Sequence, residues 1–502
     1  MEKFCAPYIS YWKRTFLSLI AIAMLLPSQA WGASVAISVD TPQDTNTTAD
    51  DYNIDTNDVT FTNNANISFA AGDTVDVVPA STGVTIINNG TISTTGIRAI
   101  DANAGSNNLT IINSGTISAT GGLGIRIQTS SGLSFTNNAG ASITSVGAAA
   151  INFGGSSGTL TNSGTISSDS QTIQTGSGTG ALTITNTASG VISSTGNIAV
   201  RLQENDTLIN FGTISSSTSQ SINLFSNNNT IILKEGSIIV GAIGVRDTAT
   251  TGNKLQIDQG FGQSYFYEIN ITAGGAIALE DLSGNVVVAG SAGSVGLGAQ
   301  ESVDELLGLR AFNLRSALKR YAAAPRIFKD DKLWAEPFSW FSKRGGNSSI
   351  LGYEALGYGI NFIYPLKQRK LDLIFTIEKS ELEIERNHDV SRTSFFAGVS
   401  APDFASLGDF KFSGFLVAGR AWHNGDREIF TNATSTGKDD IKANFQSTEF
   451  ITGGNVSHSF NRKSAGLIKN NWKTEVGFTL ACSLIEDYDE SQHFSWEERQ
   501  LI

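Results

Sequence analysis

The stretch NSGTIS, from Asn113 to Ser118, is one copy of a phrase that returns throughout the first half of the chain. Similar copies read NNGTIS from Asn88, NNAGASIT from Asn137, NSGTIS from Asn162, NTASGVIS from Asn186 and NFGTIS from Asn210. Degenerate copies, NNANIS and LKEGSII, begin at Asn63 and Leu233. From Asn63 to Asn210, the first asparagines of successive copies are 24 or 25 residues apart. A fixed period of this length is typical of a solenoid, in which no single repeat can bury its own apolar face.

Each repeat contains three short pieces in which apolar and polar residues alternate, the pattern of a strand with one buried face. Aligned repeats place an apolar residue at one position of each piece, and we predict that these three columns fill the interior. The first column is Phe61, Ile86, Ile111, Phe135, Leu160, Ile184, Leu208 and Ile231; the second is Ile67, Ile92, Ile117, Ile143, Ile166, Ile192, Ile214 and Ile238; the third is Ile97, Ile125, Ile151, Ile173, Val200, Ile222 and Val245.

The asparagine and the glycine of the phrase are predicted at a corner of each turn. Asparagine tolerates a left-handed backbone, and stacked amides can hydrogen-bond to one another along a solenoid. Threonine and serine beside the buried isoleucine point outward. The fold predicted for residues 31–300 is therefore a right-handed parallel β-helix of about eight or more turns.

The N-terminus has the features of a secretory signal peptide, residues 1–30. Lys3, Lys13 and Arg14 form a positively charged region before an apolar run at residues 16–26, and cleavage is expected after Ala30 or Gly32. Removal of this segment leaves Cys482 as the single cysteine, so no intramolecular disulfide can form. The net charge of −12 argues against nucleic acid as a partner.

The composition changes at Glu301. Residues 301–324 have helical periodicity, with an apolar stripe formed by Val303, Leu306, Leu307, Phe312, Leu314, Ala317, Leu318 and Tyr321. Alternating segments follow at residues 334–340, 358–364, 371–384, 393–399, 410–422, 449–460 and 472–484, with turns expected at 344–347, 367–370 and 424–426. Strands of about ten residues with aromatic ends are typical of an outer-membrane barrel. A soluble β-sandwich is the alternative.

This order of parts resembles the monomeric autotransporters of Gram-negative bacteria. LWAEPFSW from Leu333, GYEALGYGINFIYPL from Gly352 and KTEVGFTLACSLIEDYDE from Lys473 are similar to strands of their translocator domain. The resemblance implies a passenger at residues 31–300, a helical linker at 301–330 that threads the barrel pore, and a β-domain at 331–502. It also implies export through the periplasm and an outer-membrane location, with the passenger at the cell surface. The implied partners are outer-membrane lipids and the barrel-assembly machinery.

The family pattern has twelve strands and a C-terminal aromatic residue. Residues 331–502 supply only seven or eight strands of the usual length, and the chain ends at Ile502. An open barrel would leave two unpaired edges in lipid, which is not viable. The β-domain is therefore expected to be partial and the chain truncated.

The histidines exclude several enzyme classes. All four, His388, His423, His458 and His493, lie beyond residue 330, so the passenger has neither histidine nor, after processing, cysteine. Serine and cysteine hydrolase sites and zinc sites need these residues. We predict no catalytic residue, no metal and no cofactor.

The alternative is a polysaccharide lyase or hydrolase that uses carboxylates on the same scaffold. The acidic residues of the repeats fall at different points of their repeats, so most are not expected to form pairs: Asp73, Asp76, Asp101, Asp169, Glu204, Asp206, Glu235 and Asp247.

One candidate binding surface remains, on the outward side of the third strand. Each of its residues follows a predicted inward residue: Arg98, Arg126, Asn152, Gln174, Arg201, Asn223 and Arg246. We name these seven residues the polar stripe and predict that it recognises anionic or hydroxylated glycans. The alternative is that they are solvated outer positions. The predicted function is a displayed, adhesin-like or structural rod whose partner is a host or biofilm glycan or protein.

Overall fold

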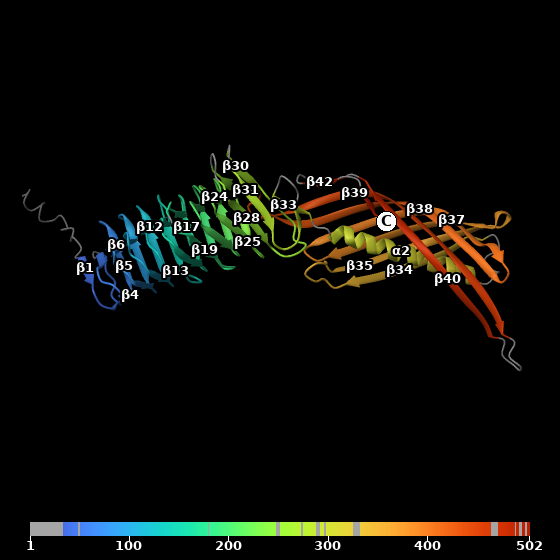
Figure 1. The fold of residues 1–502 in the computed structure, drawn as a ribbon, viewed down its shortest axis with the longest axis horizontal. Helices are drawn as coiled ribbons and strands as arrows, with labels where there is room; N and C mark the ends of the chain where they lie inside the picture. The colour runs from blue at the N-terminus through green and yellow to red at the C-terminus, as the bar shows by residue number, and fades with distance from the viewer. Residues whose placement is uncertain are drawn as a thin grey trace, which may run out of the picture. The chain divides into compact units, whose positions relative to one another are not determined.

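The computed structural model describes residues 34–48, 51–178, 180–246, 251–272, 275–287, 292–295, 298–324, 332–462, 470–486, 488–490, 494–496 and 499–501. The expected signal peptide lies outside these residues. The chain divides into two compact units, Met1–Leu182 and Thr183–Ile502. The described residues are mainly strands: a parallel β-solenoid of about ten turns, a helix, and a C-terminal antiparallel sheet of seven to eight strands (Figure 1). The prediction of an all-β chain with a parallel β-helix is confirmed.

In the first unit the strands form three parallel sheets, and from β3 to β17 each turn contributes one strand to each sheet. The first sheet contains β1 (Ser34–Ile37), β3 (Asp51–Ile54), β6 (Asp73–Val77), β9 (Arg98–Ala102), β12 (Leu123–Gln128), β15 (Ile151–Gly154) and β18 (Ile173–Thr175). The second contains β2 (Thr41–Gln43), β4 (Thr60–Asn63), β7 (Thr85–Asn88), β10 (Thr110–Asn113), β13 (Leu133–Asn137) and β16 (Gly158–Asn162). The third contains β5 (Asn66–Phe69), β8 (Thr91–Thr94), β11 (Thr116–Ala119), β14 (Ser142–Ser145) and β17 (Thr165–Ser168).

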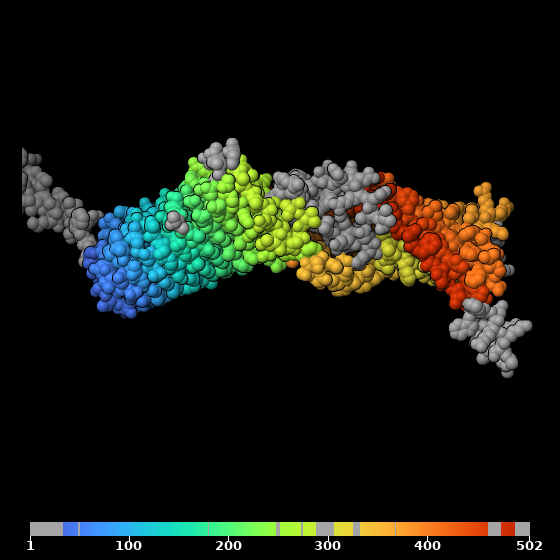
Figure 2. Space-filling view, viewed as in Figure 1, coloured from blue at the N-terminus to red at the C-terminus, as the bar shows by residue number. Residues whose placement is uncertain are grey.

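The second unit begins with the same three-strand pattern. Its strands are β21 (Val200–Leu202), β24 (Ile222–Leu224), β27 (Ile243–Val245) and β30 (Ile269–Ile271) in the first sheet; β19 (Leu182–Asn186), β22 (Thr207–Asn210), β25 (Thr230–Lys234), β28 (Asn253–Asp258) and β31 (Ile277–Asp281) in the second; and β20 (Val191–Ser194), β23 (Thr213–Ser216) and β26 (Ile238–Val240) in the third. Three further strands are β29 (Tyr265–Tyr267), β32 (Val286–Val287) and β33 (Ala292–Val295). On the face shown in Figure 2, the colours of the solenoid turns change gradually within each unit, as expected when consecutive turns are neighbours in the stack.

The apolar columns form the core, with local corrections. All residues of the first predicted column are buried. In the second column Ile239, not Ile238, pairs with Ile214 and is buried. In the third column Ile97 is 51% exposed, because it belongs to the turn that precedes β9. Ile100 takes its place and pairs with Ile125.

The corner asparagines form buried ladders, as predicted. In the first unit, Nδ2 of each asparagine donates to Oδ1 of the next, at 2.7 or 2.8 Å, through Asn63, Asn88, Asn113, Asn137 and Asn162. In the second unit, Asn186 donates to Asn210 at 2.8 Å. The glycine of the phrase is required by close backbone approach, since a Cβ on Gly115 would lie 1.9 Å from the carbonyl oxygen of Gly90.

The helix and the C-terminal sheet complete the second unit. Helix α2 spans Gly298–Ala323, three residues earlier at its start than expected. The sheet strands, each antiparallel to the next, are β34 (Trp334–Arg344), β35 (Tyr353–Leu366), β36 (Leu371–Ile384), β37 (His388–Leu407), β38 (Phe410–Thr431), β39 (Lys438–Arg462) and β40 (Asn470–Ile485). Shorter elements are η2 (Lys367–Arg369), β41 (Tyr488–Glu490), β42 (Phe494–Trp496) and β43 (Arg499–Leu501).

The expected turn at residues 424–426 is wrong. These residues lie inside β38 and pair with Asn444, Ala443 and Lys442 of β39. A continuous ladder between two long strands outweighs the local turn preference of Asn, Gly and Asp. Among the described residues, no helix has the length and apolar character needed to span a membrane.

Helix α2 packs against the concave face of this sheet. Leu306 contacts a cluster that includes Trp340 of β34 and Leu382 of β36. Further along the helix, Ala311 and Leu314 pack in a second cluster, whose other members are Ile374, Phe396, Val417 and Ile451. One helix touches strands from β34 to β40, so the sheet curves around it. Phe312 was expected in the buried stripe but is 64% exposed.

Candidate functional site

The polar stripe is only partly a continuous row. In the first unit, Arg126 lies in register between Asp101 and Asn152, and Asn152 lies beside Gln174. Arg98 is instead in register with Asp73, because Ile97 ends the turn and β9 starts with Arg98 itself. Asp101 occupies the place in the row that the sequence assigned to Arg98.

In the second unit, Arg201 lies beside Asn223 in register. Arg246 follows β27, and its backbone N–H donates to the carbonyl of Leu224. Arg246 is therefore not in register with Asn223 on the neighbouring strand. Asn223 is buried and donates its amide to Gln220. The predicted single row of seven polar residues is therefore wrong at Arg98 and Arg246, whereas Asn223 lies in the row but is buried.

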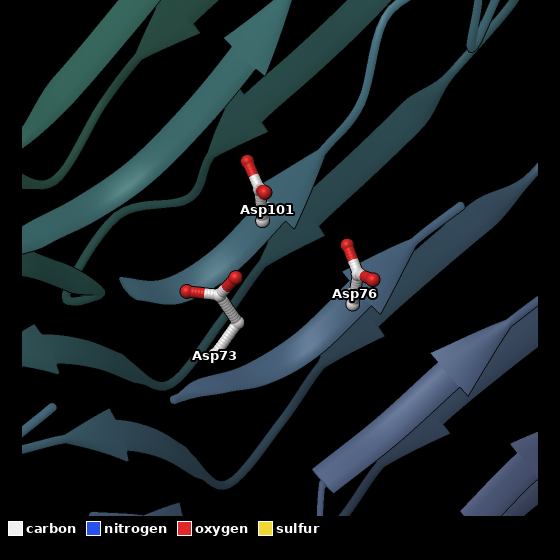
Figure 3. A group of neighbouring side chains, drawn as sticks. All are labelled: Asp73, Asp76 and Asp101. Carbon is white, nitrogen blue, oxygen red and sulfur yellow. The ribbon is translucent and has the colours of Figure 1, made fainter. Parts of the chain in front are cut away.

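Three carboxylates lie close together on the first sheet (Figure 3). Asp73 and Asp76 come from β6 and Asp101 from β9, and each offers one oxygen within 4.8 Å of the others. Arg98 Nη1 donates to Asp73 at 3.0 Å and to Asp101 at 2.7 Å. Arg126 donates two hydrogen bonds to Asp101, from Nε at 2.6 Å and from Nη2 at 2.5 Å. We name these five residues the ion-pair cluster.

Burial changes the proton affinity of this cluster. Burial, with the negative charges of Asp101 and Asp73 in addition, raises the pKa of Asp76 to about 6. Burial also raises the pKa of Asp73, although Arg98 opposes the shift. The hydrogen bond to Asp101 raises the pKa of Arg126. The pKa of Asp76 therefore lies above the usual range of an aspartate.

The geometry alone would suit a divalent cation, because carboxylate oxygens are the ligands that such ions prefer. Asp101 is the most enclosed of the three acids, with 3% of its side chain exposed, and both of its oxygens already accept bonds from arginine. The two guanidinium groups supply the positive charge that a cation would bring. We interpret the cluster as a network that links the turns of β6, β9 and β12.

The prediction that most acidic residues cannot pair missed this cluster. Asp76 and Asp101 are directly in register on neighbouring strands. Their separation of 25 residues equals the repeat length, and that spacing was the signal in the sequence that could have revealed the pair.

A different arrangement occurs in the second unit. The guanidinium carbon of Arg201 lies 3.7 Å from the centroid of the Phe225 ring, and that of Arg246 lies 4.1 Å from the same centroid. Burial and the positive charge of Arg246 lower the pKa of Arg201. We name these three residues the arginine clamp. Sequence reasoning missed Phe225 because it is not one of the polar positions of the stripe.

A third group of polar residues is buried between α2 and the curved sheet. Arg310 of α2 donates to Glu378 at 2.8 Å and to Glu449 at 2.6 Å, and Arg392 donates to Glu449 at 2.7 Å. Trp340 donates its indole N–H to Glu378 at 3.1 Å. The charged side chains are at most 6% exposed. Two arginines balance two glutamates, which is the condition under which buried charges are tolerated.

Comparisons of the chain with protein-family models, with curated proteins and with solved structures find no match. The function must therefore be inferred from the fold and from these three groups of residues.

Proposed function

We propose that this chain is an autotransporter of the outer membrane, whose solenoid is displayed at the cell surface as an adhesin-like or structural rod. The observation that supports it is the polarity of the curved sheet. Toward α2 the sheet presents charged residues, among them Glu378, Arg392 and Glu449. On the opposite face, large apolar side chains are exposed: Phe375, Ile377, Phe395, Leu416, Phe450, Phe478 and Leu480.

An ordinary soluble domain rarely buries charges and does not expose this many large apolar side chains on one face of a sheet. Along β36, Ile374 is buried while its neighbour Phe375 is 47% exposed, and Ile377 is 43% exposed while Glu378 is buried. An apolar exterior around an interior that contains buried ion pairs suits strands surrounded by lipid. The position of α2 inside the sheet suits a linker that passes from the solenoid through a pore.

Surface labelling of intact Gram-negative cells tests this proposal. A single cysteine is introduced at exposed Ser217 (Ser217→Cys) in a chain that also carries Cys5→Ser and Cys482→Ser. A membrane-impermeant maleimide should label it without permeabilisation. A cysteine at buried Thr376 (Thr376→Cys) is the matched control and should stay unlabelled. Labelling of Ser217→Cys only after the outer membrane is opened would contradict surface display.

One observation favours the glycan-cleaving alternative: the closeness of Asp73, Asp76 and Asp101. A general acid and base need carboxylates that can reach the substrate, and Arg98 and Arg126 already hold Asp101. We therefore propose a non-catalytic rod. Release of unsaturated or reducing ends from pectin or alginate by the full chain, lost on Asp76→Asn, would reverse this choice.

A further inference from the structure

We infer that one water molecule binds in a small cavity between α2 and the curved sheet, where it joins the helix to two strands. The cavity has a volume of about 10 Å³, which is room for a single water molecule. It is lined by Leu306 and Arg310 of α2, Leu382 of β36, Val390 and Arg392 of β37, and His423 of β38. This inference concerns the interior of the C-terminal sheet and does not depend on the proposed surface display.

Three of the lining side chains have a buried nitrogen that still needs a partner. Within the described residues, Nη2 of Arg310, Nε of Arg392 and Nδ1 of His423 make no hydrogen bond. The three residues are at most 5% exposed, so bulk water does not reach these atoms. A buried polar atom without a partner carries its full desolvation cost. Three such atoms around one cavity therefore indicate a bound ligand that makes hydrogen bonds.

The hydrogen bonds of His423 decide which chemistry this ligand must have. Nε2 of His423 lies 3.0 Å from Oγ of Ser447, and that hydroxyl donates its one hydrogen to Glu449 at 3.3 Å. Nε2 must therefore carry the hydrogen of the ring and donate it to Ser447, so Nδ1 is an acceptor. Stacking on Phe445, with 4.4 Å between the ring centroids, holds the imidazole in place. The cavity thus offers two arginine N–H donors and one histidine acceptor.

Water matches this set of groups, whereas an anion does not. The oxygen of a water molecule accepts a hydrogen bond from each arginine while one of its hydrogens is donated to Nδ1 of His423. These are the three bonds that a buried water typically makes. A chloride ion has no hydrogen to donate and would face the lone pair of His423. It would also add a negative charge to a group in which two buried arginines already balance two buried glutamates.

Crystals of the full chain in detergent, diffracting well enough to show ordered water, test the inference directly. We expect one electron-density peak within about 3.2 Å of Arg310 Nη2, Arg392 Nε and His423 Nδ1. Crystals soaked in bromide, which replaces chloride and scatters anomalously, should give no anomalous peak at this position. A cavity without density, or a bromide peak inside it, would overturn the inference.

A matched pair of variants gives a second test in solution. Val390→Ile adds one methylene group to a side chain that lines the cavity, and Val417→Ile makes the same change at a buried position of β38 that does not line it. If the cavity holds water, Val390→Ile displaces it and leaves the three nitrogens without a partner. Its melting temperature should then lie about 2 °C or more below that of Val417→Ile. If the cavity holds no water, the added methylene group fills it and stabilises the chain, so an equal or higher melting temperature for Val390→Ile would contradict the inference.

Discussion

At the scale of single residues, the corner asparagine connects three turns of the solenoid at once. Asn88 accepts a bond from Asn63, donates to Asn113, and also donates to the carbonyl of Thr116. The side chain is fully buried, so water cannot replace any of these bonds. A buried donor or acceptor that loses its partner carries its full desolvation cost.

Asn88→Ala should therefore lower the free energy of unfolding by about 2 kcal/mol, as expected when buried amide partners are left unpaired. Thermal and urea unfolding followed by circular dichroism measure the change. Asn89→Ala is the control, because Asn89 is exposed and the one observed bond of its side chain is to the exposed Asn64. Equal losses for the two variants would show that the buried ladder adds no stability.

The second prediction at this scale concerns Asp76, whose pKa is raised from 3.8 to about 6. A folded-state pKa above the unfolded value means that the carboxyl group of Asp76 holds its proton more tightly in the folded state than in the unfolded state. The contribution of Asp76 to stability is therefore most favourable below pH 4 and is lost as the pH rises through about 6. Asp76→Asn, which cannot ionise, should stabilise the protein at pH 8 and have little effect at pH 4.

Melting temperatures measured from pH 4 to pH 8 check this prediction. Asp55→Asn, at an exposed turn position, is the control. If Asp76→Asn is less stable than the parent chain at pH 8, the carboxylate is needed in its charged form and our interpretation of the cluster is wrong.

At the scale of elements, helix α2 shows how the sheet around it determines which residues are buried. The apolar stripe predicted Phe312 on the buried side, yet Arg310 and Ala311 are buried and Phe312 is exposed. A prediction from helical periodicity assumes that the apolar face of the helix packs against apolar neighbours. Here the concave face of the sheet carries Glu378 and Glu449, so the helix turns an arginine toward it.

Arg310→Ala should lower stability strongly, by about 3 to 5 kcal/mol, because it leaves two glutamates buried with less than their full counter-charge. Arg320→Ala, near the end of the same helix, should change it by less than about 1 kcal/mol, because Arg320 pairs with Glu336 at an exposed position. Heat-induced unfolding in detergent measures both. Similar effects for the two variants would contradict a structural role for the buried charges.

At the scale of the whole molecule, the stacked turns should behave as interchangeable units. Each turn of the first unit contacts its neighbours through the same register, for example Ile111 with Ile86 and Phe135. Stability in such a stack is approximately a sum of turns and interfaces between neighbouring turns. Removal of one complete turn brings together two turns that already fit, whereas removal of half a turn places outward residues in the core.

Deletion of residues 113–136, one full repeat, should therefore preserve the circular dichroism spectrum and protease resistance of the chain. Deletion of residues 113–124, half of that repeat, should abolish both in the affected part of the solenoid. Equal losses of the circular dichroism signal and of protease resistance in the two deletion variants would mean that the individual turns are not equivalent.

The repeat alone was sufficient to predict much of the solenoid. A phrase that returns every 24 or 25 residues places equivalent residues of consecutive turns next to one another. The strands, the first apolar column and the asparagine ladder could therefore all be predicted from the spacing. These features depend on the position of a residue within its turn, which the sequence states directly. In the C-terminal half, residues 371–384 were predicted with the bounds that β36 has.

Features that depend on turn length or on distant partners could not be predicted in this way. Ile97 is exposed because the turn before β9 extends a few residues further than the alignment of the repeats predicted, so that Ile100 pairs with Ile125 instead. Arg126 and Arg201 look alike in the sequence, but tertiary structure places Asp101 against the first and Phe225 with a second arginine against the second. Periodicity determines which way a side chain points, whereas its charge balance depends on neighbours one turn away, and only the folded chain decides which neighbours those are.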